Sequence, residues 1–364
     1  MVTRTKAVST LYTGHSDGNR QVGMGESDMA NPVAVTGSTG FIGSAVVRRL
    51  LLDGRDVRAI VEPGAKLGPL DEVERETGKQ ADRVTADVTN VAAMTRALEG
   101  CDALHHLAAV YKTWMPDPTR LYEVNLEGTA ATLLAAQKAH VRRIVYTSSI
   151  AAIGLAHGTQ LADEATRFDL FPIANEYILS KWQSERIALQ FAASGLPIVV
   201  VNPAFPFGPR DAAPTPTGKI VLSLLKGEVP GVFDGGFNCI DVDDVAAGHV
   251  AAETRGRVGE RYVLGDHNVT FAEFFALVCE VGGVKPPSLR LPASVTAAIA
   301  LGVELWSDHV SHEEPRATYR AMRYAERHAW FDPSKARREL GLPTTPLRTT
   351  IERAVGWFRA ARML

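Results

Sequence analysis

Short apolar runs alternate with segments of helical periodicity through the first half of the chain. Runs this short, bounded by glycine and polar residues, are typical of buried strands, whereas apolar residues spaced three and four apart are typical of helices. The predicted strands lie at 32–36, 56–61, 83–86, 103–109 and 143–149, and helical patterns lie at 44–53 and from 174 to 192. Strands that alternate with helices predict an α/β fold built on a parallel sheet.

The turn after the first predicted strand is rich in glycine. Its spacing is Gly37-x-x-Gly40-x-x-Gly43, and a helical pattern follows directly. Strand, glycine turn and helix form the setting of a dinucleotide site, in which the helix N-terminus faces the pyrophosphate. Gly37 permits the tight turn, Gly40 lets the backbone approach the phosphates, and Gly43 lets helix and strand pack closely. The predicted cofactor-binding residues of this turn are Gly37, Thr39, Gly40, Phe41, Ile42 and Gly43.

An acidic residue, Glu62, ends the second predicted strand, about 25 residues after Gly37. A carboxylate at this place accepts hydrogen bonds from the adenosine ribose and repels a 2′-phosphate. The sequence therefore favours NAD over NADP, although Arg58 and Lys66 lie close enough in sequence to weaken that preference.

The ends of the next strands supply further candidates. Asp87 and Val88 are placed to border the adenine, and the small residues after the fourth strand, in Leu107-Ala108-Ala109, let a cofactor lie against the backbone. His105 and His106 are adjacent on that strand, so their side chains point to opposite faces and cannot share one metal ion. We interpret both histidines as structural and expect no metal site.

Tyr177 and Lys181 are the candidate catalytic pair. They are four residues apart in a predicted helix, so both side chains leave from the same face. A phenol has a pKa near ~10, and a nearby ammonium favours the phenolate. Such a pair can donate or remove a hydroxyl proton at working pH.

Composition limits the possible partners. The net charge is −2 and no cluster of Lys and Arg indicates nucleic-acid binding. The three cysteines are scattered, which fits a reducing compartment and a cytoplasmic location. The apolar segment 293–305 is too short to span a membrane and is expected to be a buried or docking helix. Residues 1–30 carry no apolar stretch typical of a secretory signal, and we expect a disordered N-terminal extension there.

Five motifs occur in the order and spacing of a known family. They are Gly-Ser-Thr-Gly-Phe-Ile-Gly, His-Leu-Ala-Ala, Asn-Leu-Glu-Gly-Thr, Tyr-Thr-Ser-Ser and Tyr177-x-x-x-Lys181. With them the chain resembles the extended short-chain dehydrogenase/reductases, the NAD-dependent epimerase/dehydratase family. The resemblance continues to the segment 332–336 and is greatest for the branch that holds dihydroflavonol reductases, aldehyde or ketone reductases and hopanoid-associated sugar epimerases.

The resemblance implies a Rossmann domain, a doubly wound parallel sheet, with a smaller discontinuous C-terminal substrate domain. The expected division gives residues 31–203 and 237–265 to the NAD-binding domain and residues 204–236 and 266–364 to the substrate-binding domain. It also implies a homodimer that associates through two long helices.

The same resemblance assigns roles to individual residues. Tyr177 is the general acid/base, and Lys181 binds the nicotinamide ribose and lowers the tyrosine pKa. Ser149 holds the substrate oxygen, with Ser148 as an open alternative, and Asn125 supports a water relay to the lysine. The remaining cofactor-binding residues that it implies are Pro203, Ala204 and Phe205.

Three functions are compatible with these residues. The first is an NAD-dependent oxidoreductase acting on a secondary alcohol, ketone or aldehyde; the second is a nucleotide-sugar epimerase or dehydratase that retains its NAD; the third is a non-catalytic NAD-binding regulator. A nucleotide-sugar site needs arginines for the diphosphate, yet residues 235–238 carry no cation, and Arg323 and Arg327 give no clear match to a second family arginine. Apolar residues are also expected in the cleft, namely Val110, Tyr111, Trp114, Met115, Phe205 and Phe207. The sequence therefore favours the oxidoreductase, with a small-molecule substrate. Many reductases of this branch carry arginine at the position of Glu62, and the reversed charge here again favours NAD.

Overall fold

The computed structural model describes residues 31–156, 158, 160–315 and 318–364. The predicted extension at residues 1–30 lies outside them. Within the described part, the larger sheet has the strand order β10-β6-β5-β4-β1-β2-β3, and every neighbouring pair is parallel. Its strands are β1 (Val33–Thr36), β2 (Val57–Val61), β3 (Asp82–Thr85), β4 (Ala103–His106), β5 (Arg143–Thr147), β6 (Ile198–Pro203) and β10 (Arg261–Leu264).

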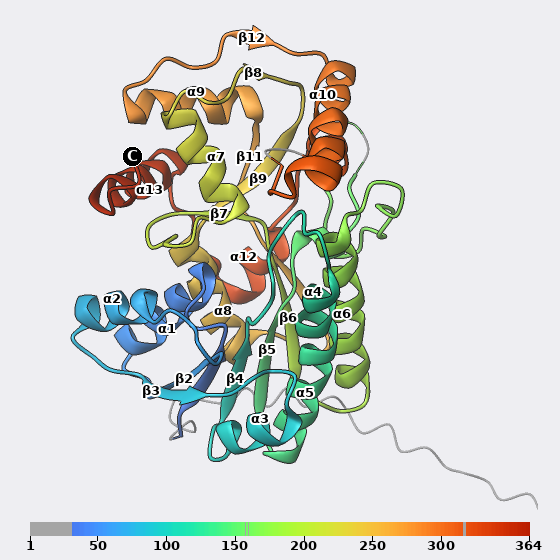
Figure 1. Ribbon diagram of the computed structural model, residues 1–364. Coiled ribbons are helices and arrows are strands. Elements are labelled where there is room, and N and C mark those ends of the chain that lie inside the picture. Colours follow the sequence, from blue (N-terminus) through green and yellow to red (C-terminus); the bar gives the residue numbers. More distant parts are fainter. Residues whose placement is uncertain (1–30, 157, 159, 316–317) are drawn as a thin grey trace, which may run out of the picture.

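Helices cover both faces of this sheet (Figure 1). Strand β1 shows how, because Val33 and Val35 belong to one buried cluster and Ala34, between them, belongs to another. The first cluster lies under α1 (Phe41–Leu52), α2 (Gly68–Thr77) and α8 (Val242–Arg255), and the second under α3 (Val91–Leu98), α5 (Gly128–Lys138) and α6 (Glu176–Ala193). Apolar side chains on both faces explain the unbroken apolar runs in the sequence. The predicted doubly wound α/β fold is confirmed.

A smaller sheet lies beyond the carboxyl ends of the large one (Figure 1). Its centre is β9 (Gly236–Asp241), which pairs with β7 (Phe205–Phe207), β11 (His267–Thr270) and β13 (His328–Ala329). Phe207, Phe237 and Phe274 form its buried core, with ring centroids 4.8 to 6.0 Å apart. The helices around it are α7 (Pro216–Leu225), α9 (Phe271–Gly282) and α13 (Leu347–Ala360), and a two-stranded sheet joins β8 (Gly231–Val232) to β12 (Leu289–Arg290).

The chain crosses between the two sheets more than once. Strand β9 belongs to the smaller sheet, although the predicted NAD-binding domain included residues 237–265. Helix α8 and strand β10, which follow β9, do return to the larger sheet. The domain boundaries stay a prediction, and this strand is the place where sheet membership differs from them.

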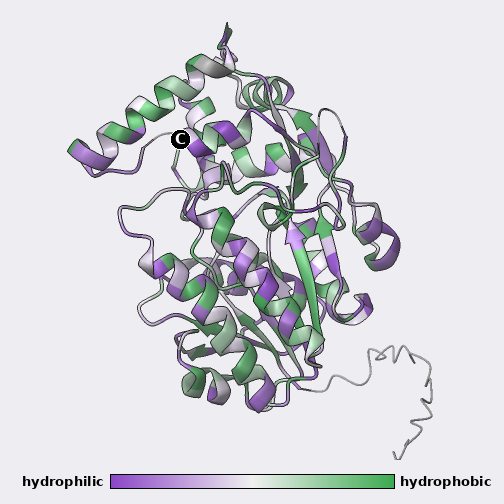
Figure 2. Cartoon of the chain, turned by 90° about the vertical axis from the view of Figure 1, so that its right-hand side faces the viewer, coloured by the Kyte–Doolittle hydropathy of each residue, from purple (hydrophilic) through white to green (hydrophobic). Residues whose placement is uncertain are grey.

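The helices after β12 pack on both sheets, with α11 (Tyr319–Ala325) against β13 of the smaller sheet and α12 (Ser334–Leu340) against α8 and β10 of the larger one. Before them, helix α10 (Ala293–Trp306) continues into the π-helical turn η4 (Ser307–Ser311). Helix α10 projects from the molecule, and much of its surface is apolar (Figure 2); Trp306, for example, is 60% exposed. In the described part of the chain, no helix is both long and apolar enough to cross a membrane.

Candidate active site and dinucleotide groove

The predicted site residues gather at one edge of the larger sheet. The carboxyl ends of parallel strands meet at the same edge, and ligands of open α/β sheets bind there. The turn after β1, the ends of β2 to β6 and the start of α6 all lie at this edge. The sequence could indicate each strand end separately, but only the strand order brings them together.

The glycine turn fits a pyrophosphate. Gly37 has a φ of 64°, and a Cβ there would stand 2.8 Å from the backbone nitrogen of Ala108. A Cβ on Gly43 would stand 2.0 Å from the carbonyl oxygen of Gly37. Helix α1 begins after Gly40 without a side-chain cap, so the N–H groups of its first turn have no capping side chain as acceptor. These observations support the roles predicted for the three glycines.

Thr36, which the sequence did not single out, ties this turn to the end of β4. Its Oγ1 accepts hydrogen bonds from the N–H groups of Leu107 at 3.1 Å and Ala108 at 3.2 Å, and lies 2.8 Å from Nδ1 of His106. Because two N–H groups use the lone pairs of the hydroxyl, it donates its hydrogen to Nδ1, and the neutral ring of His106 carries its own hydrogen on Nε2. Burial, followed by the charge of Lys181, lowers the pKa of His106 to about 3, which keeps the ring neutral. His106 is therefore structural, as predicted.

His105 points to the other face of the sheet. Its Nε2 lies 2.7 Å from Oε2 of Glu253 on α8, and both side chains are fully buried. In the described ranges, no group of three or more His, Cys, Asp or Glu side chains is arranged to hold a metal ion.

The adenosine end of the groove contains a residue that the sequence missed. Arg120, on the short helix α4 (Thr119–Tyr122), places Nη2 2.8 Å from Oε1 of Glu62 and 3.6 Å from Oδ2 of Asp87. A hydrogen bond from the backbone N–H of Thr89 is the largest cause that lowers the pKa of Asp87, and Arg120 adds to it. Arg58, in contrast, is directed to Asp82 and to backbone carbonyl groups.

Tyr177 lies in the first turn of α6, where Asn175 caps the helix by accepting from the N–H of Ile178. Burial raises the pKa of Tyr177 to about 12, and the nearby Ser149 opposes that rise. This corrects the expected lowering of the tyrosine pKa, because burial dominates the pKa of the phenol and Lys181 is not among the causes of its shift. Tyr177 is therefore a neutral phenol near pH 7, the form that donates a proton.

The two serines at the end of β5 have different environments. Ser149 is close enough to Tyr177 to act on its pKa, and its Oγ accepts from the N–H of Ala151 at 3.1 Å in the 3₁₀ turn η3 (Ile150–Ala152). Ser148 is buried, and its Oγ has no hydrogen-bond partner among the described residues. The effect of Ser149 on the pKa of Tyr177 favours this serine over Ser148.

Lys181 is buried one turn after Tyr177. Its Nζ donates to the carbonyl oxygen of Thr147 at 2.8 Å and lies 5.4 Å from the ring centroid of Tyr146. Burial lowers the pKa of Lys181 to about 8, and Glu185 opposes that shift.

Asn125 lies in the π-helical turn η2 (Glu123–Glu127). Its Oδ1 accepts from the N–H of Val110 at 2.7 Å, while its Nδ2 donates to the carbonyl oxygen of Val110 at 3.1 Å and to Oγ of Ser180 at 2.9 Å. Both amide hydrogens are thus used in joining the loop after β4 to α6. The predicted water relay to Lys181 stays a prediction.

The predicted apolar residues separate into two groups. Tyr111 lies against Tyr177, with 4.6 Å between ring centroids, and the indole N–H of Trp114 donates to Asp308 of η4. Phe205 and Phe207 instead pack on Phe237 in the smaller sheet. Burial, followed by the nearby Tyr177, raises the pKa of Tyr324 on α11, a residue that the sequence did not indicate. The wall beside Tyr177 is therefore aromatic.

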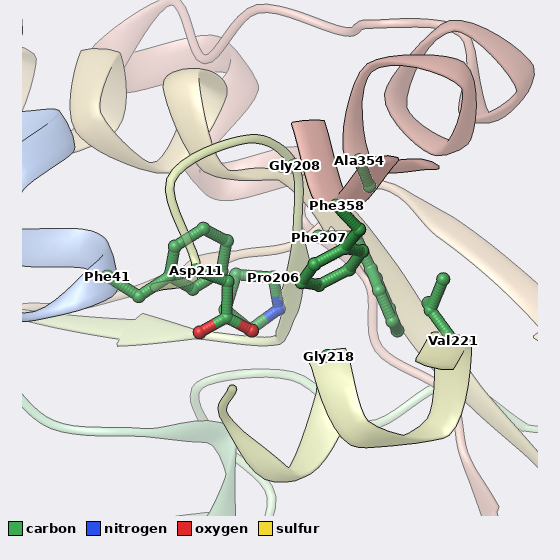
Figure 3. Close-up of a pocket in the computed structure, with 9 residues that line it drawn as sticks. All are labelled: Phe41, Pro206, Phe207, Gly208, Asp211, Gly218, Val221, Ala354 and Phe358. Atoms are coloured by element: carbon green, nitrogen blue, oxygen red, sulfur yellow. The ribbon is translucent and has the colours of Figure 1, made fainter. Parts of the chain in front are cut away.

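A shallow hollow lies next to the glycine turn. Phe41, Pro206 and Asp211 line it together with Phe358 of α13 (Figure 3). Burial raises the pKa of Asp211 to about 6, while hydrogen bonds from Thr215 oppose the shift. The predicted cofactor residues Pro203 and Ala204 lie nearby at the end of β6, where Ala204 donates its N–H to the carbonyl oxygen of Leu264 at 2.9 Å.

Residues 235–238, where the sequence has no cation for a diphosphate, lie at the start of the buried strand β9. Asn238 of β9 is fully buried and hydrogen-bonds Asn268 at 2.8 Å. Of the upstream arginines, Arg323 pairs with Glu326 at 2.6 Å, and Arg327 lies 4.0 Å from Asp169.

The fold and the site define an NAD(P)-binding enzyme of the extended short-chain dehydrogenase/reductase class. The model of the NAD dependent epimerase/dehydratase family matches residues 33–265, and the chain belongs to that family. The predicted resemblance is confirmed.

Three similar proteins show how broad the family is. A Synechocystis protein named "Putative dihydroflavonol 4-reductase" is 36% identical over 335 residues, which cover 91% of this chain and 95% of that protein. Sterol demethylase protein B of Methylococcus capsulatus is 32% identical, over 91% of this chain and 99% of its own. The crystal structure of PA4631, a nucleoside-diphosphate-sugar epimerase from Pseudomonas aeruginosa, has a TM-score of 0.75 and 28% identity, covering 91% of this chain and 98% of that one.

Proposed function

We propose that this protein is an NAD-dependent oxidoreductase that transfers a hydride between the cofactor and a secondary alcohol, ketone or aldehyde. The observation that carries this proposal is that Tyr177 has beside it both Ser149, which acts on the pKa of its phenol, and the aromatic ring of Tyr111. This arrangement provides a proton donor and a surface for an apolar substrate in one place.

The chain's own residues supply the proton chemistry. The nicotinamide, when bound, donates or accepts the hydride. Ser149 and Tyr177 hold the substrate oxygen, and the neutral phenol of Tyr177 donates its proton to that oxygen as the carbonyl is reduced. Lys181 holds the nicotinamide ribose, and Asn125 keeps the loop after β4 in place against α6. In the opposite direction the same phenol oxygen takes the proton back.

An apolar substrate fits the wall beside Tyr177. The ring of Tyr111 lies against Tyr177, and the relatives named above include proteins whose names refer to a sterol and to a dihydroflavonol. These names support a ring-bearing substrate, and the direction of reduction agrees with the raised pKa of Tyr177.

A nucleotide-sugar epimerase or dehydratase is the second candidate. The likeness to PA4631 favours it, since that protein is named a nucleoside-diphosphate-sugar epimerase. The buried strand around Phe237 and Asn238 counts against it, because that strand carries no Lys or Arg and a diphosphate requires cations. A non-catalytic regulator is the third candidate, and the presence of both Tyr177 and Lys181 counts against that reading.

Whether the purified protein still holds NAD distinguishes the oxidoreductase from the epimerase. A dehydrogenase releases its spent cofactor in each cycle, so we expect largely nucleotide-free protein whose activity on an apolar ketone, aldehyde or alcohol depends on added NAD or NADH. UDP is expected to protect poorly against thermal unfolding, since only a ligand of the folded state stabilises it. Stoichiometric NAD after purification, together with clear stabilisation by UDP, would replace the oxidoreductase with the epimerase.

Two further points belong to the proposal. NAD is proposed as the preferred cofactor because Glu62 ends β2. We also propose the division into NAD-binding residues 31–203 and 237–265 and substrate-binding residues 204–236 and 266–364.

The homodimer and the cytoplasmic location stay predictions. Size-exclusion chromatography with light scattering tests whether the protein is a dimer.

A further inference from the structure

We propose that Arg120 recognises a 2′-phosphate on the adenosine ribose, so that the groove accepts NADP beside NAD despite the acidic residue at the end of β2. This inference rests on the proposed dinucleotide binding. It names the residue that sets the choice between the two cofactors.

The position of Arg120 is the first argument. Its guanidinium lies between Glu62 and Asp87, which follow the adjacent strands β2 and β3. Those strand ends form the part of the groove that receives the adenosine. Arg120 reaches them from α4, which follows β4 in the chain, so it comes from a different part of the sequence than Glu62.

The charges near Arg120 are the second argument. The guanidinium of Arg120 pairs with three carboxylates. Its Nη2 lies near Glu62 and Asp87, and its Nη1 lies 3.5 Å from Oε2 of Glu123. The side chains of Arg120 and Glu62 are 43% and 64% exposed, so their ion pair is weak and readily exchanged. A guanidinium binds a phosphate at least as well as a carboxylate, through two parallel hydrogen bonds. Arg120 can therefore leave Glu62 for a 2′-phosphate.

Two cofactors then use the same groove in two ways. With NAD, Glu62 accepts a hydrogen bond from the 2′-hydroxyl, and Arg120 stays with Asp87 and Glu123. With NADP, Arg120 binds the 2′-phosphate and offsets the charge of Glu62. Arg58, the nearest arginine in the sequence of β2, is not available for this role because it is bound to Asp82 and to the carbonyl oxygens of Ala97 and Glu99.

Calorimetric titration with 5′-ADP and 2′,5′-ADP separates the phosphate from the rest of the cofactor. Wild-type protein is expected to bind both, and Arg120→Met is expected to lose at least about tenfold in affinity for 2′,5′-ADP while its affinity for 5′-ADP changes less than about threefold. The control variant is Arg96→Met, which removes the same charge from the exposed side of α3 and is expected to change neither affinity. The loss is also expected to shrink as salt rises, because the contact is between exposed charges.

Several outcomes would overturn the inference. An equal loss for both ligands in Arg120→Met would make Arg120 a contact of the adenine or of the fold. If Arg120→Met keeps its affinity for 2′,5′-ADP, or if Lys66→Met loses as much of that affinity, Arg120 is not the residue that recognises the phosphate. Wild-type protein that binds 5′-ADP but not 2′,5′-ADP would exclude NADP and leave the proposed NAD function standing. Wild-type protein that binds neither ligand would reject the proposed function as well.

Discussion

The ring of Tyr111 lies against the ring of Tyr177, with 4.6 Å between their centroids and an angle of 42° between their planes. Tyr111 comes from the loop after β4 and Tyr177 from the first turn of α6. Asn125 holds that loop through the backbone of Val110, so the aromatic neighbour and the proton donor are fixed relative to each other. Substrate that reaches Tyr177 therefore meets a flat aromatic surface.

Removing the hydroxyl of Tyr177 tests its role as the acid. Tyr177→Phe is expected to lower turnover by about a hundred- to ten-thousand-fold, because general acid/base catalysis contributes that much. Cofactor affinity and the free energy of unfolding are expected to change little. Tyr111→Phe is the control, since it removes a neighbouring hydroxyl and keeps both rings. Steady-state kinetics that show most of the activity in Tyr177→Phe would exclude this residue as the proton donor.

Neutralising Glu62 is expected to change the choice of cofactor. Glu62→Gln keeps the size of the side chain and removes the charge that opposes a 2′-phosphate, so the ratio of NADP to NAD affinity is expected to rise by about tenfold. Titration of both cofactors followed by tryptophan fluorescence measures this ratio. A wild-type preference for NADP would show that Glu62 does not control the selection.

Lys181 is expected to make stability depend on pH. Its pKa is lowered from 10.5 in an exposed lysine to about 8 by burial. Between about pH 8 and 10.5 the unfolded chain therefore binds a proton that the folded protein does not, so the wild type gains stability as pH rises through this range. Lys181→Met lacks this gain, and its free energy of unfolding relative to wild type is expected to fall by up to about 3 kcal/mol from pH 7.5 to 10.5. Urea unfolding at several pH values measures the difference, and a constant difference would contradict the lowered pKa.

Thr36 is expected to be needed for both stability and cofactor binding. Thr36→Val keeps the shape of the side chain but leaves the N–H groups of Leu107 and Ala108 without their acceptor, which is expected to cost about 2 kcal/mol or more. Thr36→Ser keeps the hydroxyl and serves as the control. Urea unfolding and cofactor titration are the measurements. If valine is tolerated as well as serine, the hydroxyl does not hold the loop.

Much of the fold could be predicted because its strands are buried on both faces and read as apolar runs. The Gly37 turn and the Tyr177–Lys181 pair are also local features, since their spacing alone places them on a turn and on one helix face. Strand β9 is a counterexample: its sequence gave no sign that it leaves the larger sheet, because its partners β7, β11 and β13 are distant in the chain.

The missed site residues have a common physical reason. Arg120 reaches Glu62 and Tyr324 reaches the neighbourhood of Tyr177 from segments far away in sequence. Neither belongs to a spacing pattern, and an arginine or tyrosine in a helix is ordinarily a surface or core residue. The raised pKa of Tyr177 could likewise not be predicted from the sequence, because it depends on how deeply the phenol is buried.

The crossing of the chain between its two sheets has a consequence for dissecting the protein. The region that the family model matches ends at residue 265, yet β9 within it would lose its neighbours β11 and β13 in a chain shortened at that point. The buried carboxylate of Asp241 would also lose Thr350 and Arg353, both of which donate to it at 2.9 Å. A fragment of residues 31–265 is therefore expected to expose strand edges and aggregate on expression, so an isolated nucleotide-binding module is better sought by circular permutation than by truncation.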